Sequence, residues 1–246
     1  MRDVSQREYA QRMKNIYKGR AIPSTSPALN SESLRKFRTE LDEIRIEHVN
    51  IVGDFLKVNE NFYSLDTFFV AIAQRSYELV DGFISMLDEV NFSVMAPILR
   101  MQIDNLIRAS YVSRSRNPDE IASDFMTGTE FRKMKSPDGS KLTDYALKDE
   151  AIAHHPWIFD VYEKTSGWIH LSPAHVHTSI KTERVSDGAL VKLHFPRSSE
   201  DISVEALEDI CFALIKVTQE LFEYLEGWYA VKGLPKGESR PPRNQR

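Results

Sequence analysis

The most constraining feature of this sequence is the segment 93–113, which is apolar on almost every side when it is drawn as a helix. A helix at the surface of a protein would instead confine its apolar residues to one stripe. A helix of this kind needs neighbours all around it, so we expect it to lie at the centre of a bundle. Its apolar residues are Ile98, Leu99, Met101, Ile103, Leu106, Ile107, Tyr111 and Val112.

Three further long helices are predicted from the helical spacing of apolar residues, over 31–58, 64–90 and 203–233. In the last of these, apolar residues recur at alternating intervals of three and four, the pattern of a seam between packed helices. This seam would either close the core of the chain or pair two subunits. Its members are Val204, Leu207, Cys211, Leu214, Thr218, Leu221, Leu225 and Trp228.

Shorter helices are predicted between the central helix and the last one. They cover 117–134, a segment that ends at residue 153, and 157–171. The fold class that follows is mainly α: one bundle of about five to seven helices. A small β-hairpin, at about 175–195, is expected before the long C-terminal helix.

The hairpin is predicted because apolar residues alternate with polar ones between His175 and Phe195. Ser186-Asp187-Gly188 lies between the two alternating runs and favours a tight turn. With Asp187-Gly188 as a two-residue loop, each cross-strand pair is chemically compatible. The pairs expected in this register are Ile180 with Phe195, Thr182 with Leu193, and Glu183 with Lys192.

The composition is that of a globular protein. The chain has 246 residues, 41% of them hydrophobic and 28% charged, which excludes wholesale disorder and is enough for a core. The net charge is −4, yet both ends are basic. We expect a basic N-terminal segment and linker over 1–30, a single helical domain over 31–233, and a basic disordered tail over 234–246. The basic ends would contact RNA, DNA or an acidic partner, or would be no more than solvated termini.

A single cysteine, Cys211, excludes an intramolecular disulfide. Its apolar helical surroundings predict a small buried side chain rather than a reactive thiol. No stretch approaches the roughly 18 uninterrupted apolar residues of a membrane span, and the first residues lack the apolar region of a secretory signal. We therefore expect a cytoplasmic protein without a membrane partner.

Arg100, Asp104 and Arg108 lie at positions i, i+4 and i+8 of the central segment, so they share one face of its helix. Charges are costly to bury unless they are paired, so this stripe needs partners or lines a cavity. One interpretation is a structural ladder, completed by Glu78 or Asp81, that fixes the register of neighbouring helices. The other is an anion-binding or catalytic cleft in which the arginines hold a phosphate.

Histidines gather in the segment 154–177, which holds five of the seven in the chain. Clustered imidazoles can bind zinc or another divalent transition metal, and His170, His175 and His177 would be its ligands. Their spacing matches no zinc motif, since the chain has no HExxH and no CxxC. We therefore predict no cofactor and interpret these histidines as surface or interface residues.

Glu163, Ser166 and His170 lie at i, i+3 and i+7 on one face of a predicted helix. A carboxylate, a serine and a histidine suggest nucleophilic catalysis. Three members on one helix rarely reach triad geometry, and the chain has no GxSxG elbow, which argues against a serine hydrolase. If the protein is an enzyme, we expect His170 to act as a general acid–base beside Arg100 or Arg108, because histidine titrates near neutrality.

Two segments resemble a group of uncharacterised bacterial helical proteins. The first is the helix VMAPILRMQIDNLIRASYVSR followed by NPDE, and the second is YEKTSGWIHLSPAHVH. The resemblance covers roughly residues 60–180 and its motifs are degenerate. These proteins are compared with the HEPN and abortive-infection class of helical bundles, in which an arginine and a histidine cleave RNA. The matching positions are Leu99-Arg100, Pro118-Asp119-Glu120, Tyr162, Ser166 and His170.

The resemblance implies an activity on RNA or phosphodiesters in stress or phage defence. Together with the helical spacing of the charged residues, it leads us to expect His170 as acid–base, Arg100 and Arg108 as phosphate holders, and Asp104, Ser166, Tyr162 and Glu163 in support. HEPN nucleases carry a histidine about four to six residues after the arginine, and no arginine here has one at that distance. A site would thus be assembled from separate helices. The alternative hypothesis is a non-enzymatic homodimer, paired through the C-terminal helix, that binds a ligand, a metal or a protein.

Overall fold

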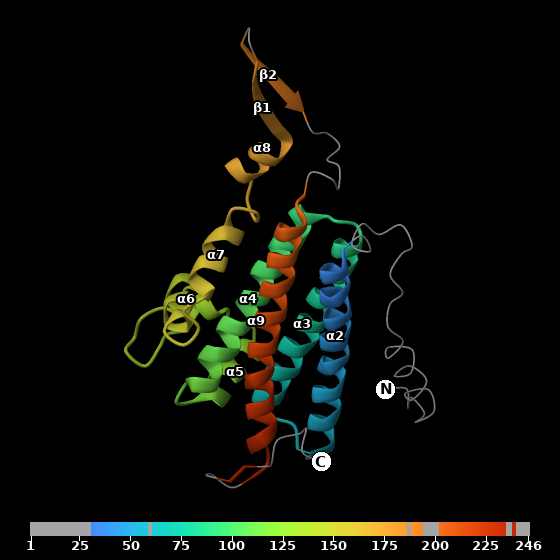
Figure 1. Cartoon of the computed structure of the whole chain (residues 1–246). Coiled ribbons are helices and arrows are strands. Elements are labelled where there is room, and N and C mark those ends of the chain that lie inside the picture. Colours follow the sequence, from blue (N-terminus) through green and yellow to red (C-terminus); the bar gives the residue numbers. More distant parts are fainter. Residues whose placement is uncertain (1–30, 59–60, 186–187, 194–201, 235–237, 240–246) are drawn as a thin grey trace.

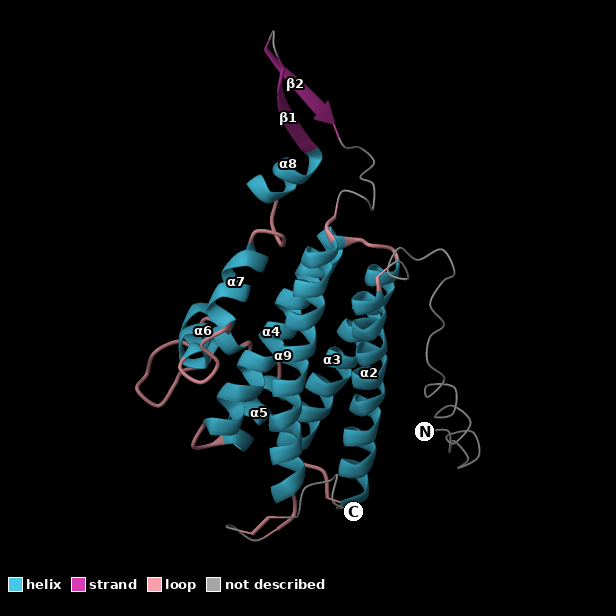
Figure 2. Cartoon of the chain, in the orientation of Figure 1, coloured by secondary structure: helices cyan, strands magenta, loops and turns pink. Residues whose placement is uncertain are grey.

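The computed structural model describes residues 31–58, 61–185, 188–193, 202–234 and 238–239. It is mainly α-helical, as predicted, and its four long helices lie side by side in a bundle (Figure 1). Shorter helices flank α4, and a last short helix leads into the hairpin (Figure 2). The long helices are α2 (Glu32–Val58), α3 (Ser64–Asp88), α4 (Phe92–Arg114) and α9 (Val204–Val231). The shorter ones are α5 (Pro118–Met126), the 3-10 turn Phe131–Lys133, α6 (Asp144–Ile152), α7 (Ile158–Ser166) and α8 (Pro173–Ser179).

The central position predicted for α4 is confirmed. It packs against α3 and α9 on one side and against α5, α6 and α7 on the other. Because neighbours surround it, buried residues occur all along its length, among them Met95, Ile103, Leu106 and Val112. The helices that could form a site with α4 are therefore its direct neighbours.

The seam of α9 closes the core of its own chain. Ser203 caps the helix as expected: its Oγ accepts from the backbone N–H of Ala206 at 3.2 Å. Gly233 follows the last turn with φ 67°, a left-handed conformation that glycine adopts without strain. All seam residues except the exposed Val204 are buried, namely Leu207, Cys211, Leu214, Thr218, Leu221, Leu225 and Trp228.

A buried chain of hydrogen bonds links the four long helices. Nε2 of His48 accepts from Oγ of Ser76 at 2.6 Å. The side-chain amide of Gln102 donates to Ser76 at 2.6 Å and to Thr218 at 3.0 Å. Nδ1 of His48 donates to the carbonyl of Ile44 at 2.8 Å. Because the four side chains come from α2, α3, α4 and α9, this network specifies how the helices align along one another.

Two buried ion pairs hold the same helices at their ends. Nζ of Lys232, just after α9, lies 2.8 Å from the carboxylate of Asp66 at the start of α3. The indole of Trp228 donates to the same carboxylate at 3.0 Å. Arg38 of α2 pairs with Asp88 of α3, Nε to Oδ1, at 3.1 Å. Both carboxylates are buried, and hydrogen bonds compensate their desolvation.

The predicted hairpin is present, and it projects with α8 beyond one end of the bundle (Figure 2). Its strands are β1 (Ile180–Val185) and β2 (Gly188–Leu193). The predicted start at His175 is wrong, because Pro173 occupies the first helical position, which proline favours, and 173–179 is helical. The segment therefore turns extended only at Ile180.

The predicted hairpin register is also wrong. Val185 pairs with Gly188, so the two residues between the strands are 186 and 187 rather than Asp187 and Gly188. The shift amounts to two residues, which leaves every side chain on its original face. The alternation of apolar residues therefore cannot distinguish the two registers. The observed pairs include Ile180 with Leu193, Thr182 with Val191, and Glu183 with Leu190.

Two short helices end earlier than predicted. α5 ends at Met126, and Gly128 follows with φ 94°, a conformation that stops a helix. α7 ends at Ser166, where the hydroxyls of Thr165 and Ser166 bond to backbone carbonyls one turn back. The predicted segment 1–30 lies outside the described residues, as does all of the tail except 234, 238 and 239.

Candidate functional site

The charged stripe of α4 meets α3 and α6. Arg108 pairs with Asp104 one turn before it, and its Nη2 lies 2.9 Å from Oδ1 of Asp144, the first residue of α6. Nη1 of Arg75, from α3, lies 3.3 Å from the other oxygen of Asp104. The predicted ladder thus exists in part: Asp104 pairs with Arg108 but not with Arg100 among the described residues. The partners of the ladder are Arg75 and Asp144.

The partners predicted for this ladder lie elsewhere. Glu78 accepts a hydrogen bond from Gln74 at 2.8 Å. Asp81 lies 3.4 Å from Arg45 of α2. Asp81 thus pairs with α2, and Glu78 bonds within α3. Successive residues of a helix are rotated by about 100°, so Arg75 lies on a different face of α3 from Asp81. The sequence alone therefore predicted the wrong face of α3 to contact α4.

Arg100 differs from the other two arginines. Its guanidinium carbon lies 3.5 Å above the centre of the Tyr162 ring, which comes from α7. Its Nε is buried without a hydrogen-bond partner. Among the residues that the structure describes, no carboxylate lies within ion-pair distance of Arg100. The side chain is thus held by Tyr162 through a cation–π contact, and the charge of Asp144 acts on it without a direct ion pair.

The three guanidinium groups are partly withdrawn from water. Burial lowers the pKa of Arg75, Arg100 and Arg108. Tyr162 and the charge of Asp144 oppose this change for Arg100, and Asp144 opposes it for Arg108, while the nearby charge of Arg75 lowers the pKa of both. Arginine nevertheless stays protonated at neutral pH. Like charges held together in this way are unfavourable alone, and an anion placed among them would be stabilised.

Lys148 of α6 extends the group toward α7. Its Nζ lies 3.1 Å from Glu163 and is bordered by the rings of Tyr145 at 5.0 Å, Tyr162 at 5.1 Å and Phe159 at 5.7 Å. Tyr145 is 68% exposed and Phe159 is 49% exposed. Large aromatic side chains are thus presented to solvent beside a cluster of cations.

We name this group the arginine–aromatic surface. Its four cations lie beside the carboxylates of Asp104, Asp144 and Glu163, and the charge of Asp149 also acts on Lys148. It brings together five of the predicted site residues, since Arg100, Asp104, Arg108, Tyr162 and Glu163 all belong to it. The members of the surface are Arg75, Arg100, Asp104, Arg108, Asp144, Tyr145, Lys148, Phe159, Tyr162 and Glu163.

His170 and Ser166 occupy different positions from those expected. Because α7 ends at Ser166, no continuous helical face joins Glu163, Ser166 and His170. Oγ of Ser166 donates to the carbonyl of Tyr162 at 2.7 Å. His170 is exposed, and within the described chain no hydrogen bond or ion pair joins it to Arg100 or another arginine of the surface. Catalysis by His170 stays a prediction.

The histidines proposed as metal ligands lie after α7. The backbone N–H of Ser172 donates to Nδ1 of His175 at 3.3 Å, and the His175 ring packs edge-on against Trp168. His177 is on α8, and its side chain lies outside the described residues. Across the described residues, no three or more histidine, cysteine, aspartate or glutamate side chains are placed to hold a metal ion.

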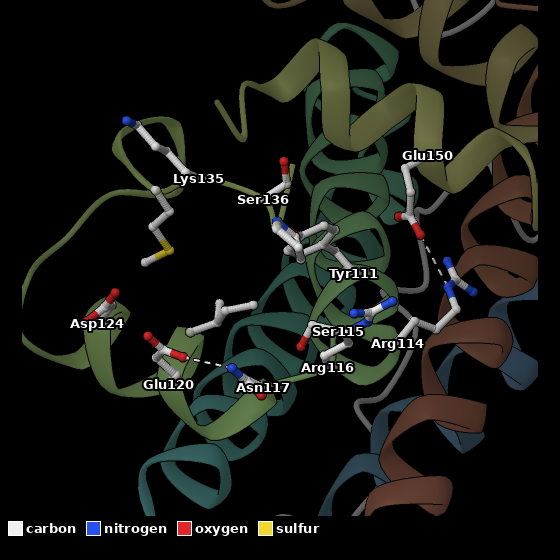
Figure 3. A pocket seen from close by; sticks show the side chains of 13 residues that line it. Tyr111, Arg114, Ser115, Arg116, Asn117, Glu120, Asp124, Lys135, Ser136 and Glu150 are labelled. Carbon is white, nitrogen blue, oxygen red and sulfur yellow. Dashed lines mark hydrogen bonds and ion pairs between the residues drawn. The ribbon is translucent and has the colours of Figure 1, made fainter. Parts of the chain in front are cut away.

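A cavity of about 570 Å³ lies between the end of α4, α5, the following loop and α6 (Figure 3). Tyr111, Ile121 and Met134 supply apolar surface, and charged residues of both signs stand around them. Arg114 at its edge is already engaged, because its Nε lies 3.3 Å from Glu150 and its Nη1 donates to Tyr224. The cavity carries no net charge that would select a ligand, so it is a weaker candidate than the arginine–aromatic surface.

Sequence reasoning missed Arg75, Asp144, Tyr145, Lys148 and Phe159. Asp144 and Lys148 lie one helical turn apart, and Tyr145 lies beside Asp144, so a face of α6 with acid, base and aromatic residues was visible in the sequence. Nothing in the sequence indicated that this short helix packs on α4. Arg75 adjoins the polar stripe of α3 and has no distinguishing spacing.

Comparisons with protein-family models, with curated proteins and with solved structures give no match to this chain. None of the described helices has the length and apolar character needed to cross a membrane.

Proposed function

We propose that the arginine–aromatic surface binds single-stranded RNA through its phosphodiester backbone. The observation that carries the proposal is the state of Arg100, a half-buried guanidinium without a carboxylate partner in the described chain, beside two further arginines. A phosphate group would supply the direct ion pair that Arg100 does not make within the described residues, and its oxygens match the donors of a guanidinium.

The exposed rings support RNA rather than a lone anion. Proteins that bind single strands combine cations, which contact phosphates, with aromatic side chains on which bases stack. Tyr145 and Phe159 border Lys148, so a strand lying on this surface would find both kinds of contact within reach. Because phosphate contacts and stacking tolerate any base, we expect little sequence preference.

The proposal concerns binding and not cleavage. The acid–base expected from the sequence, His170, forms no hydrogen bond or ion pair with the surface within the described residues, while Tyr162 and Glu163 do belong to it. The bound RNA should therefore be recovered intact. A role in stress or phage defence stays a prediction from the resemblance. The alternative of a homodimer paired through α9 would require a different face of that helix, because its seam lies in the core.

The test is the affinity for a fluorescent oligouridine of about 12 nucleotides, measured by anisotropy at several salt concentrations. Arg100→Gln should weaken binding about tenfold or more and lower the slope of log Kd against log salt by about one. Arg35→Gln, an exposed arginine on α2, is the matched control and should change Kd by less than about twofold. Equal affinities of the two variants, or no RNA binding by the unaltered protein, would overturn the proposal. Gel electrophoresis of the recovered RNA tests whether it stays intact.

A further inference from the structure

A second polar cluster lies on the other side of α6, where the loop after that helix meets α9. It contains Glu220 and Tyr224 of α9, His155 of the loop, and Arg114 at the end of α4. Nδ1 of His155 lies 2.6 Å from Oε2 of Glu220, and its Nε2 lies 2.8 Å from the hydroxyl of Tyr224. Nη1 of Arg114 donates to the same hydroxyl at 3.0 Å. None of these residues belongs to the arginine–aromatic surface.

The chemistry of the partners assigns the protons. An ionised carboxylate only accepts hydrogen bonds, so Nδ1 of His155 carries a proton and donates it to Glu220. In the tautomer of the neutral ring that this donation selects, Nε2 is an acceptor for the Tyr224 hydroxyl. The oxygen of that hydroxyl accepts from Arg114. The phenol thus lies between the imidazole of His155 and the guanidinium of Arg114, which is also paired with Glu150.

The carboxylate that orients His155 is itself held firmly. The indole N–H of Trp157 donates to Glu220 at 2.8 Å, and Nζ of Lys216 lies 2.9 Å from the same oxygen. His155 is buried, whereas Arg114 stands at the edge of the cavity in Figure 3 beside Glu150. A nucleophile, a base within hydrogen-bond reach and a third group that orients the base form the arrangement of an activated nucleophile.

We infer that Tyr224 is a nucleophile toward phosphate esters, with His155 as its general base, Arg114 as the cation beside the attacked group and Glu220 as a positioning residue. In the step, the Tyr224 oxygen forms a bond to phosphorus while the bond from phosphorus to the leaving oxygen breaks. The phenolic proton passes to Nε2 of His155, which then protonates the leaving oxygen. The product is a phosphotyrosyl protein and a free alcohol or phenol. This inference goes beyond RNA binding and does not depend on it.

The test uses bis(4-nitrophenyl) phosphate, an activated phosphodiester whose leaving group is coloured. The whole chain should release one equivalent of 4-nitrophenol in a burst, and mass spectrometry should find the remaining 4-nitrophenyl phosphoryl group on Tyr224. Tyr63 is the matched control, because its ring is 58% exposed while Tyr224 is half-buried. Labelling driven by exposure alone would favour Tyr63. Tyr224→Phe should abolish the burst, and Tyr63→Phe should leave it unchanged.

The role of His155 is separated from a structural one by chemical rescue. His155→Ala should slow labelling of Tyr224 about tenfold or more, and added imidazole should restore part of the rate. Circular dichroism shows whether the variant is folded, and Glu220→Gln, which keeps the side-chain volume, gives a second variant with a smaller loss. No adduct on Tyr224, equal labelling of Tyr63, or labelling that ignores both His155→Ala and imidazole would overturn the inference. Arg100→Gln should label at the unaltered rate, so failure here is distinct from failure to bind RNA.

Discussion

Nε2 of His48 and Oγ of Ser76 lie 2.6 Å apart in a part of the core where both side chains are buried. The imidazole accepts this bond, so the structure requires its neutral form. Burial lowers the pKa of His48 from 6.5 to about 4, although the hydrogen bond to the Ile44 carbonyl opposes the change. Protonation of this one ring therefore opposes the packing of α2 against α3.

We expect the free energy of unfolding to decrease as the pH falls from 6.5 toward 4. In this window the unfolded chain binds a proton at His48 that the folded chain does not, so acid favours unfolding. The loss approaches about 3 kcal/mol at pH 4 and is absent above pH 6.5. Urea unfolding at several pH values measures it. His48→Gln should flatten this dependence, while His154→Gln, an exposed control, should keep it.

Loss of the ion pair between Lys232 and Asp66 should be costly. Lys232→Met leaves a buried carboxylate without its cation, so we expect a loss of about 3–5 kcal/mol. The side chains of the pair are 3% and 5% exposed. Lys36→Met removes a pair with Glu32 whose side chains are 77% and 78% exposed, and should cost less than about 1 kcal/mol. Denaturant unfolding measures the free energy of unfolding of both variants. Similar losses in the two would contradict a stabilising role of the buried pair.

Tyr145→Ala should weaken RNA binding without altering stability. Stacking of one base on an exposed ring contributes about 1–3 kcal/mol, so Kd should rise at least about fivefold. The salt dependence of Kd should stay unchanged, because no phosphate contact is lost. Phe212→Ala removes a ring of similar exposure from α9, far from the surface in sequence, and serves as the control. If both variants bind equally well, bases do not stack on Tyr145.

Cys211 should not react with thiol reagents while the protein is folded. The side chain is fully buried, and burial, followed by the charge of Glu208, raises the pKa of its thiol above the ordinary range. A disulfide reagent such as Ellman's should give no colour with the native protein and one equivalent in denaturant. Rapid reaction at neutral pH without denaturant would show that α9 opens locally.

The helical core was predictable because its signals are local and repeated. Apolar residues recur over four long segments, and Ser203 and Gly233 mark the ends of α9 by their own backbone chemistry. The predictions were wrong where one local sequence signal fits two different structures. A two-residue slip of the hairpin keeps every face, and Pro173 can either follow one helix or begin the next.

The candidate site was predictable only in part, for the same reason. Arg100, Asp104 and Arg108 share a face by spacing, whereas the contacts of Arg100 with Tyr162 and of Arg108 with Asp144 depend on how α6 and α7 pack on α4. Such packing follows from the whole core and not from a motif. The contact between His155 and Tyr224 joins residues far apart in the sequence, and no spacing rule indicates it.

The place of α9 in the core has a consequence for synthesis on the ribosome. Residues 204–231 are made after all the other described helices, yet their buried side chains complete the packing of α2 and α4. Until these residues emerge, the apolar faces of α2 and α4 stay exposed on the nascent chain, and chaperones must shield them. A premature stop before residue 204 would thus yield a product destined for proteolysis rather than a smaller working protein.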